Sequence, residues 1–330
     1  MRHADWLRFI HSRNAVGVMT LMAGGAMWVA SKAGVTAPAP YTCGIINTVT
    51  QPLIASGATS LYFSIGINIV IALLLIYLNK IFNPMRAMTN LQAGLFMIMQ
   101  GALPASAVWF GSGELLALVA ILCIFLLYAS YSDTGAMRNI FLAFLLISAL
   151  SAADTASLIL LPVFWLALAQ MRIFSLRSVL ASLLGLATPW IILLGLGIVT
   201  PDRLQFTMPK VASFFAGTPD EVPMLVTVAT TAFLTVAAWL QNAMKILSYN
   251  ARFRAFQSVL SVLSLVVILA VTLDYTRVMA YIPLLDCCAA MQVAHLFAAV
   301  HRREKSYIAV LSLVFIYILF YLWTIITCIS

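Results

Sequence analysis

Long apolar runs follow one another along almost the whole chain, and few charged residues interrupt them. Hydrophobic residues make up 63% of the 330 residues and charged residues only 8%, too few to cover the surface of a soluble protein of this size. A run of about twenty apolar residues is long enough to cross a bilayer as a helix. The sequence therefore predicts a multi-pass membrane protein. The apolar runs are about 15–31, 59–79, 91–110, 114–130, 139–152, 155–171, 178–199, 223–246, 255–272, 277–300 and 307–328.

These runs favour an all-α, polytopic bundle of about 11 transmembrane segments, with 10–12 as the range. They lack the short alternation of apolar and polar residues that marks the strands of a membrane barrel. No soluble domain is indicated, so residues 1–330 are predicted to form a single integral-membrane domain. The basic head before the first run is long for a secretory signal, and VASKAG is a poor cleavage site, so we expect the first helix to be retained.

The basic residues indicate the orientation of the chain. If the N-terminus lies in the cytoplasm and each run crosses the membrane, 14 of the 18 basic residues fall on the cytoplasmic side. The other 4 are Lys32, Arg203, Lys210 and Arg277. This asymmetry predicts a cytoplasmic N-terminus and an extracytoplasmic C-terminus. The net charge of +8 then reflects topology and attraction to anionic headgroups, so membrane lipids are the expected partners and nucleic acid is not.

The runs 139–152 and 155–171 predict an unusual hairpin, because a cytoplasmic arginine flanks each of them. The first arm has about 14 residues, which span roughly 21 Å at 1.5 Å per residue, short of a 30 Å hydrocarbon core. Its turn is therefore expected below the outer surface, as a recessed loop or as the tip of a re-entrant pair. Asp154 lies in this turn as a candidate catalytic acid or as an ordinary solvated turn residue, and of the two the solvated turn is favoured.

Asp286 is the second acidic candidate. It lies about nine residues inside the run that begins at Arg277, roughly 13 Å along a helix and in the outer half of the membrane. Ala289 and Ala290 follow at helical spacing and allow close approach of another helix, so Asp286 is expected to face the bundle. A carboxylate at this depth points either to a functional site or to a structural pair with a neighbouring helix.

The nearby cysteines and histidine do not predict a metal site. His295 lies nine residues after Asp286, which places it on the opposite side of the helix. Cys288 shares a face with His295 but lies about 10 Å away along the axis, too far to share one ion. His295 is expected to be an interfacial or core residue. We expect no metal and no cofactor, since the motifs for nucleotide phosphates, dinucleotides and zinc proteolysis are also missing.

Polar or helix-breaking residues occur within several runs: Asn68, Gln100 with Gly101 and Pro104, and Thr188 with Pro189. Interrupted helices frame the binding sites of many transporters, so Asn68 and Gln100 are candidate substrate contacts, although proline and glycine are also common in ordinary transmembrane helices.

Two outer connections complete the candidate regions. Residues 41–60 mix apolar and polar residues and predict an interfacial helix or a re-entrant lid. Residues 200–222 carry Arg203 and Lys210, which either bind a phosphate or belong to a solvated loop.

The chain also resembles a known family. NKIFNPMR, RNIFLAFLLISALSAADTASLILLPVFW, MRIFSLRSVLASLLGLATPW and YIPLLDCCAAMQVAHLF are similar to an uncharacterised family of multi-pass inner-membrane proteins of the Bacteroidota. The likeness covers about 60–330 and implies location in the bacterial inner membrane. Asp154 and Asp286 lie outside the shared pattern.

A more distant likeness is to integral-membrane glycan polymerases and to glycosyltransferases that use polyprenyl-phosphate sugars. It implies many helices and an extracytoplasmic acidic site. Many such transferases carry a catalytic acid in their first long outer loop, whereas residues 32–58 hold no Asp or Glu.

Three functional hypotheses remain open at this point. The first is a role in envelope glycoconjugate assembly, acting on a lipid-linked, polyprenyl-type substrate at the outer leaflet. Asp154 or Asp286 would be the acid or base, and Arg203, Lys210 or Arg277 would contact phosphate. The second is a transporter or flippase in which Asp286 couples to protons. The third is a non-catalytic subunit of a membrane protein complex, so the sequence leaves open whether the protein is an enzyme.

Overall fold

The computed structural model describes residues 12–35, 41–42, 44–46, 50–54, 56–84, 89–199, 222–245, 249–299 and 306–329. Each apolar run named above corresponds to at least one helix among the described residues. The bundle consists of α2 (Arg13–Lys32), α3 (Gly57–Phe82), α4 (Leu91–Gly101), α5 (Pro104–Val108), α6 (Ser112–Ala129), α7 (Met137–Ala153), η1 (Thr155–Ile159), α8 (Leu160–Gln170), α9 (Leu176–Gly195), α10 (Val222–Lys245), α11 (Ala251–Leu273), η5 (Tyr275–Arg277), α12 (Val278–Ala299) and α13 (Ser306–Ile329).

Eight helical stretches are long and apolar enough to cross a membrane, counted over the residues that the structure describes. They correspond to α2, α3, α6, α9, α10, α11, η5 with α12, and α13, while 137–153 and 155–170 are shorter apolar helices. Large apolar side chains stay exposed around the bundle, such as Leu21 at 78%, Phe233 at 74% and Leu176 at 77%. Such a surface suits lipid and not water. The chain is a multi-pass helical membrane protein.

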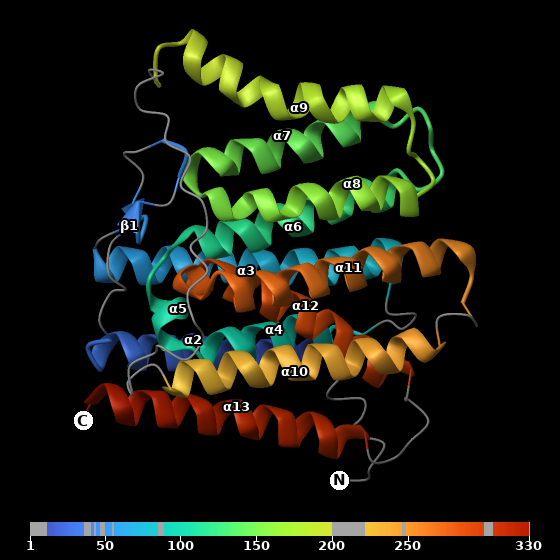
Figure 1. The fold of residues 1–330 in the computed structure, drawn as a ribbon. Coiled ribbons are helices and arrows are strands. Elements are labelled where there is room, and N and C mark those ends of the chain that lie inside the picture. Colours follow the sequence, from blue (N-terminus) through green and yellow to red (C-terminus); the bar gives the residue numbers. More distant parts are fainter. Residues whose placement is uncertain are drawn as a thin grey trace.

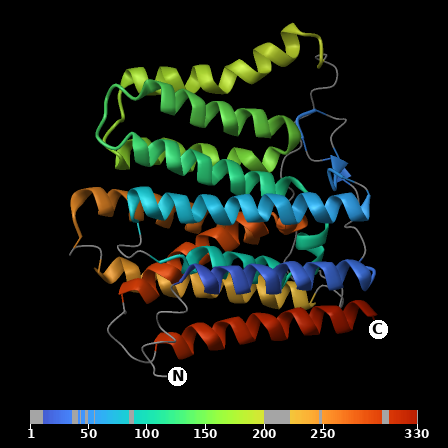
Figure 2. The same cartoon turned by 180° about the vertical axis from the view of Figure 1, so that it is seen from behind.

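Successive helices run in opposite directions and lie roughly side by side (Figures 1 and 2). One end of the bundle carries a small antiparallel hairpin, β1 (Tyr41–Thr42) paired with β2 (Thr50–Gln51). We call this end the sheet end. The starts of α3, α6 and α12 and the ends of α7 and α11 meet there (Figure 1). Residues from distant parts of the sequence therefore come together at this end.

Helix α12 forms the centre of the bundle and packs against α4, α6, α10 and α11. Its span is 89% buried, whereas those of α9 and α13 at the periphery are 17% buried. A helix that is apolar on all sides is expected in the interior. The consecutive residues Cys287, Cys288, Ala289 and Ala290 are all fully buried, which is possible because small side chains let neighbouring helices approach from every side.

Helices α7, α8 and α9 stack as a subgroup at one side of the bundle (Figure 1). Helix α7 has 17 residues, about 25 Å at 1.5 Å per residue, so it is longer than the sequence predicted. The turn after it is covered: the amide of Ile45 lies 3.5 Å from the carbonyl oxygen of Ser151. A Cβ on Gly44 would meet the carbonyl oxygen of Ala152. The turn is therefore recessed beneath the hairpin segment.

Two expectations about local structure were wrong. Residues 41–60 were expected to form an interfacial helix or a re-entrant lid. Among the described residues of this range, Tyr41–Thr42 pair with Thr50–Gln51 as the β1–β2 hairpin and α3 begins at Gly57, so the interfacial helix was wrong. The strand preference of Tyr41, Thr42 and Thr50 is consistent with the hairpin. Of the three runs with polar or breaking residues, only the one with Gly101 and Pro104 is interrupted, between α4 and α5. Helix α3 continues past Asn68, and α9 continues through Pro189.

Candidate functional site

Buried polar side chains gather at the sheet end. We call them the sheet-end cluster; they come from β2, α6, the turn after α7 with the start of η1, the α11–α12 connection and the first turn of α12. The cluster consists of Gln51, Ser112, Glu114, Asp154, Thr155, Asp274, Arg277 and Tyr281.

Asp154 connects three of these elements. Its Oδ2 accepts a hydrogen bond from the Ser112 hydroxyl, and its Oδ1 accepts one of 2.8 Å from the amide of Ala156, as the cap of η1. Only 1% of the residue is exposed, so the solvated-turn interpretation was wrong. Asp154 lies in the turn outside the candidate spans, where burial raises the pKa of its carboxyl and the hydrogen bond from Ser112 opposes that effect.

Arg277 lies between two carboxylates. Its Nη1 is 4.0 Å from Oδ1 of Asp154, and its Nε is 4.0 Å from Oδ2 of Asp274. The same Nη1 donates a hydrogen bond to the Thr155 hydroxyl. Asp274 in turn accepts a 3.0 Å hydrogen bond from the hydroxyl of Tyr281. The structure thus joins Asp154 and Arg277, two of the residues predicted from the sequence, in one ion-pair network.

Glu114 is a third carboxylate in the cluster, and sequence reasoning missed it. It lies in the first turn of α6, where its Oε2 accepts a 3.1 Å hydrogen bond from the amide of Gly111. Its Oε1 accepts a 3.1 Å hydrogen bond from the hydroxyl of Ser64, which itself accepts one of 3.3 Å from Nδ2 of Asn68. Asn68, a predicted substrate contact, is thus linked to Glu114 through Ser64.

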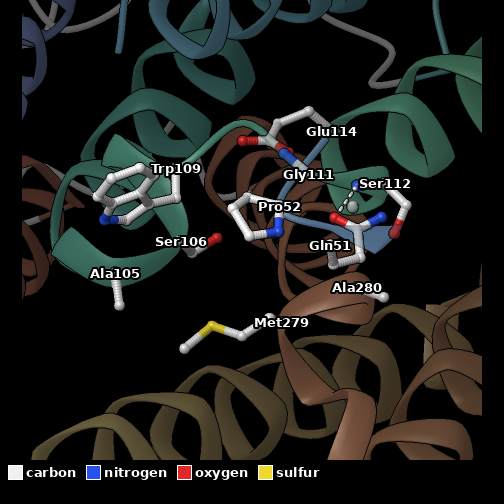
Figure 3. A pocket seen from close by; sticks show the side chains of 11 residues that line it. Gln51, Pro52, Ala105, Ser106, Trp109, Gly111, Ser112, Glu114, Met279 and Ala280 are labelled. Atoms are coloured by element: carbon white, nitrogen blue, oxygen red, sulfur yellow. Dashed lines mark hydrogen bonds between the residues drawn. The ribbon is translucent and has the colours of Figure 1, made fainter. Parts of the chain in front are cut away.

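A small cavity of about 30 Å³ opens beside Glu114 and Ser112 (Figure 3). Gln51, Ser106, Trp109 and Met279 also line it. This volume admits a water molecule or one hydroxyl group. The Oε1 of Gln51 accepts a 3.1 Å hydrogen bond from the amide of Ser112, while its buried Nε2 has no hydrogen-bond partner among the described residues. The cavity therefore offers acceptors and an uncommitted amide donor beside an aromatic ring.

Asp286 does not belong to the sheet-end cluster. It lies nine residues beyond Arg277, roughly 14 Å along the helix axis. Its Oδ2 accepts a 2.8 Å hydrogen bond from Nε2 of Gln100, and both residues are buried. Gln100 and Asp286 were predicted separately as candidates, and the structure pairs them between α4 and α12. The two candidate acids therefore occupy different sites.

The remaining predicted residues have simpler positions. His295 is 1% exposed, with its ring 5.4 Å from that of Phe253 and 5.9 Å from that of Tyr249, as expected of a core histidine. No group of three or more His, Cys, Asp or Glu side chains suited to a metal occurs in the part of the chain that the structure describes. Arg203 and Lys210 lie outside the described residues.

Glu114 and Asp274 could have been found from the sequence. The orientation rule places both, together with Asp154, near helix ends on the side with few basic residues. Three acids that share one membrane surface are a signal even when they are far apart in sequence.

The comparisons with known proteins give no relative for this site. No family model matches the chain, and no match was found among curated proteins or among solved structures.

Proposed function

We propose that this protein resides in the bacterial inner membrane and acts on a lipid-linked sugar at the outer leaflet during envelope glycoconjugate assembly. The sheet-end cluster is its chemical site. The observation that carries the proposal is the gathering of three buried carboxylates at one end of the bundle: Asp154 and Asp274 flank the guanidinium of Arg277, and Glu114 lines a small cavity there. Buried ionisable groups in a membrane protein are costly, which makes them a functional-site hypothesis by default.

The basic residues support an extracytoplasmic position of the sheet end. Lys32 and Arg277 lie at this end. The opposite end holds a larger set: Lys80, Arg138, Arg172, Arg177, Lys245, Arg252 and Arg254. Cytoplasmic loops carry the excess of lysine and arginine, so we place the N-terminus inside and the C-terminus outside. This orientation holds whether the 137–170 hairpin crosses the membrane or enters and leaves it on the cytoplasmic side.

The lining of the cavity favours a sugar as the group that is bound. Hydroxyl groups pair with carboxylate, amide and serine side chains, and Glu114, Gln51 and Ser112 supply these beside the ring of Trp109. The cavity admits only one hydroxyl in this conformation, so binding of a whole sugar requires its lining residues to move apart.

The chemistry that suits these groups is glycosyl transfer. Asp154 would take the proton of an acceptor hydroxyl as that oxygen attacks the anomeric carbon. The bond from that carbon to the polyprenyl phosphate breaks, and the phosphate leaves with the electron pair near Arg277. Burial raises the pKa of Asp154, which makes it a stronger base than an exposed aspartate.

Substitution of the cluster tests this function in the native host. Asp154→Asn, Glu114→Gln and Arg277→Lys should each deplete the mature envelope glycan and accumulate its lipid-linked precursor, seen on glycan gels and by lipid mass spectrometry. For Asp154→Asn we expect a loss of at least roughly 100-fold in transfer rate, the lower range for removing a general base. Asp133→Asn is the matched control, because Asp133 is exposed in a turn at the opposite end.

Normal glycan profiles in all three cluster variants, produced at wild-type levels, would exclude this mechanism. In that case a partner that copurifies in stoichiometric amount would indicate a subunit of a membrane complex.

A second candidate function follows from the buried Asp286–Gln100 pair in the central helix. A carboxylate enclosed at this depth is a common element of proton-coupled transport. That function requires pH-dependent substrate flux in proteoliposomes that Asp286→Asn abolishes, and flux independent of protons would rule out this role for Asp286.

A further inference from the structure

We propose that an apolar groove between α2, α4 and α13 holds the hydrocarbon chain of the lipid-linked substrate, with the polyprenyl chain as its occupant. This inference rests on the proposed function and extends it from the sugar to the lipid. The groove has a volume of about 270 Å³ and an almost entirely apolar lining. Ala23, Ala26, Gly101 and Ala102 line it together with the rings of Tyr317 and Tyr321.

The two tyrosines hold the groove in shape without making it polar. The hydroxyl of Tyr321 donates a 2.9 Å hydrogen bond to the carbonyl oxygen of Ala26, which ties α13 to α2. The hydroxyl of Tyr317 lies 2.8 Å from that of Thr231 on α10. Both polar atoms thus have partners, so the aromatic faces are left to contact a chain.

Small residues line the base of the groove and leave its space unfilled. A Cβ on Gly101 would lie 3.2 Å from both Cα and Cβ of Ala23, so α2 and α4 pack closely there. Helix α13 lies alongside α2 on the outer face of the bundle, as Figure 2 shows for the red and dark blue helices. The shallow space between these helices suits a branched chain such as a polyprenyl, whose methyl groups fit beside alanine and glycine.

The groove lies next to the sheet-end cavity. Ala102 lines the groove and Ala105 lines the cavity, on either side of the break between α4 and α5. The two alanines are three positions apart in the sequence, which limits their Cα atoms to a separation of about 11 Å. Ala26 lies six residues before the end of α2, roughly 9 Å along the axis, so the groove is on the sheet-end half of the membrane. A lipid with its chain in the groove can place its headgroup at the cavity.

Photolabelling in nanodiscs tests this placement. The probe is a polyprenyl phosphate with a diazirine on its chain, and mass spectrometry locates the labelled residues. We expect labels on the groove segments of α2, α4 and α13, displaced by unlabelled polyprenyl phosphate and not by diacyl phosphatidylglycerol. Labelling spread over all lipid-facing helices, or equal displacement by the diacyl lipid, would show ordinary contact with bulk lipid and overturn the proposal.

Two exposed leucines on α13 provide a matched pair of variants. Leu322 lines the groove and Leu319 does not, although each is 47% exposed. Leu322→Trp should lower groove labelling about fivefold, while Leu319→Trp should leave it unchanged. The effect is modest because a chain that moves from lipid into an apolar groove gains only packing contacts. Ala26→Phe, which fills the floor, should act like Leu322→Trp; equal labelling in all three variants would refute the groove.

Different experimental results would contradict the lipid groove and the proposed chemistry. Asp154→Asn should retain chain labelling, because the carboxylate lies outside the groove. If the groove is labelled selectively but the cluster variants have normal glycan profiles, the lipid site is supported and the transferase function is excluded. If the cluster variants have abnormal glycan profiles but the probe labels residues outside the groove, the proposed chemistry is supported and the groove is excluded as the lipid site.

Discussion

At the residue scale, the pair of Gln100 and Asp286 shows how a polar group is held inside the bundle. Both side chains are buried, and one 2.8 Å hydrogen bond joins them. The Oε1 of Gln100 has no hydrogen-bond partner in the described part of the chain. Loss of one partner would leave the other buried without its hydrogen bond, which costs more than replacing both with apolar groups.

This asymmetry gives a measurable prediction. Gln100→Leu should destabilise the protein by about 1–3 kcal/mol, because it leaves the Asp286 carboxyl without this donor. The double variant Gln100→Leu with Asp286→Leu should recover most of the loss. Thermal unfolding in detergent, followed by tryptophan fluorescence, measures both. Asp286→Asn serves as a control that keeps a hydrogen-bonding side chain, and a Gln100→Leu variant as stable as the wild type would contradict the structural role.

The burial of a single residue was easier to predict from the sequence than the identity of its hydrogen-bond or ion-pair partner. Ala289 and Ala290 after Asp286 indicated that the acid faces the bundle, and the structure confirms its burial. No sequence pattern indicated Gln100 as the partner, because the two are 186 positions apart and their pairing depends on how α4 and α12 cross. The same holds for Asp154 and Arg277, which are joined only by packing at the sheet end.

At the scale of elements, glycines set the distances between helices. Among the described helices, α7 and α9 have the most extensive contact, and Gly185 lies in it: a Cβ there would be 2.5 Å from the carbonyl oxygen of Phe141. The hydroxyl of Ser148 donates a 2.6 Å hydrogen bond to the carbonyl oxygen of Leu186, which fixes α9 against α7 at this level. The close packing of α9 against α7 thus depends on the absence of a side chain at Gly185.

Gly185→Ala should therefore push α9 away from α7 and destabilise the protein by about 1–3 kcal/mol, the usual cost of overpacking. Limited proteolysis should cut the region around α9 faster in this variant. Gly66→Ala is the matched control, since Gly66 lies inside α3 with nothing within 4 Å of an added Cβ. That control should be neutral or stabilising by up to about 1 kcal/mol. Equal behaviour of the two variants would show that Gly185 is not a close contact.

The helices themselves were well predicted because long apolar runs are a strong signal. The break at Gly101 and Pro104 was also indicated, since both residues disfavour a continuous helix. The β1–β2 hairpin was missed because two-residue strands leave no periodic pattern and the paired residues Tyr41 and Gln51 are ten positions apart. Pro189 was expected to interrupt its helix, but α9 continues through it.

At the scale of the whole molecule, orientation in the membrane decides which compartment the sheet-end cluster faces. The fold alone does not set this direction; the lysines and arginines do, and they gather at the end away from β1 and β2. Every part of the proposed function that involves an outer-leaflet sugar depends on this asymmetry.

Cysteine labelling measures the orientation directly. Ser56 and Thr134 are exposed residues at opposite ends of the bundle, so each can be replaced by cysteine in a background without the native cysteines. In intact spheroplasts a membrane-impermeant maleimide should label Ser56→Cys at once and Thr134→Cys only after lysis. The difference should be nearly complete, because a charged reagent does not cross the hydrocarbon core. The reverse result would place the sheet-end cluster in the cytoplasm, where no outer-leaflet substrate can reach Asp154. Equal labelling of both sites before lysis would show that the chain inserts in two orientations.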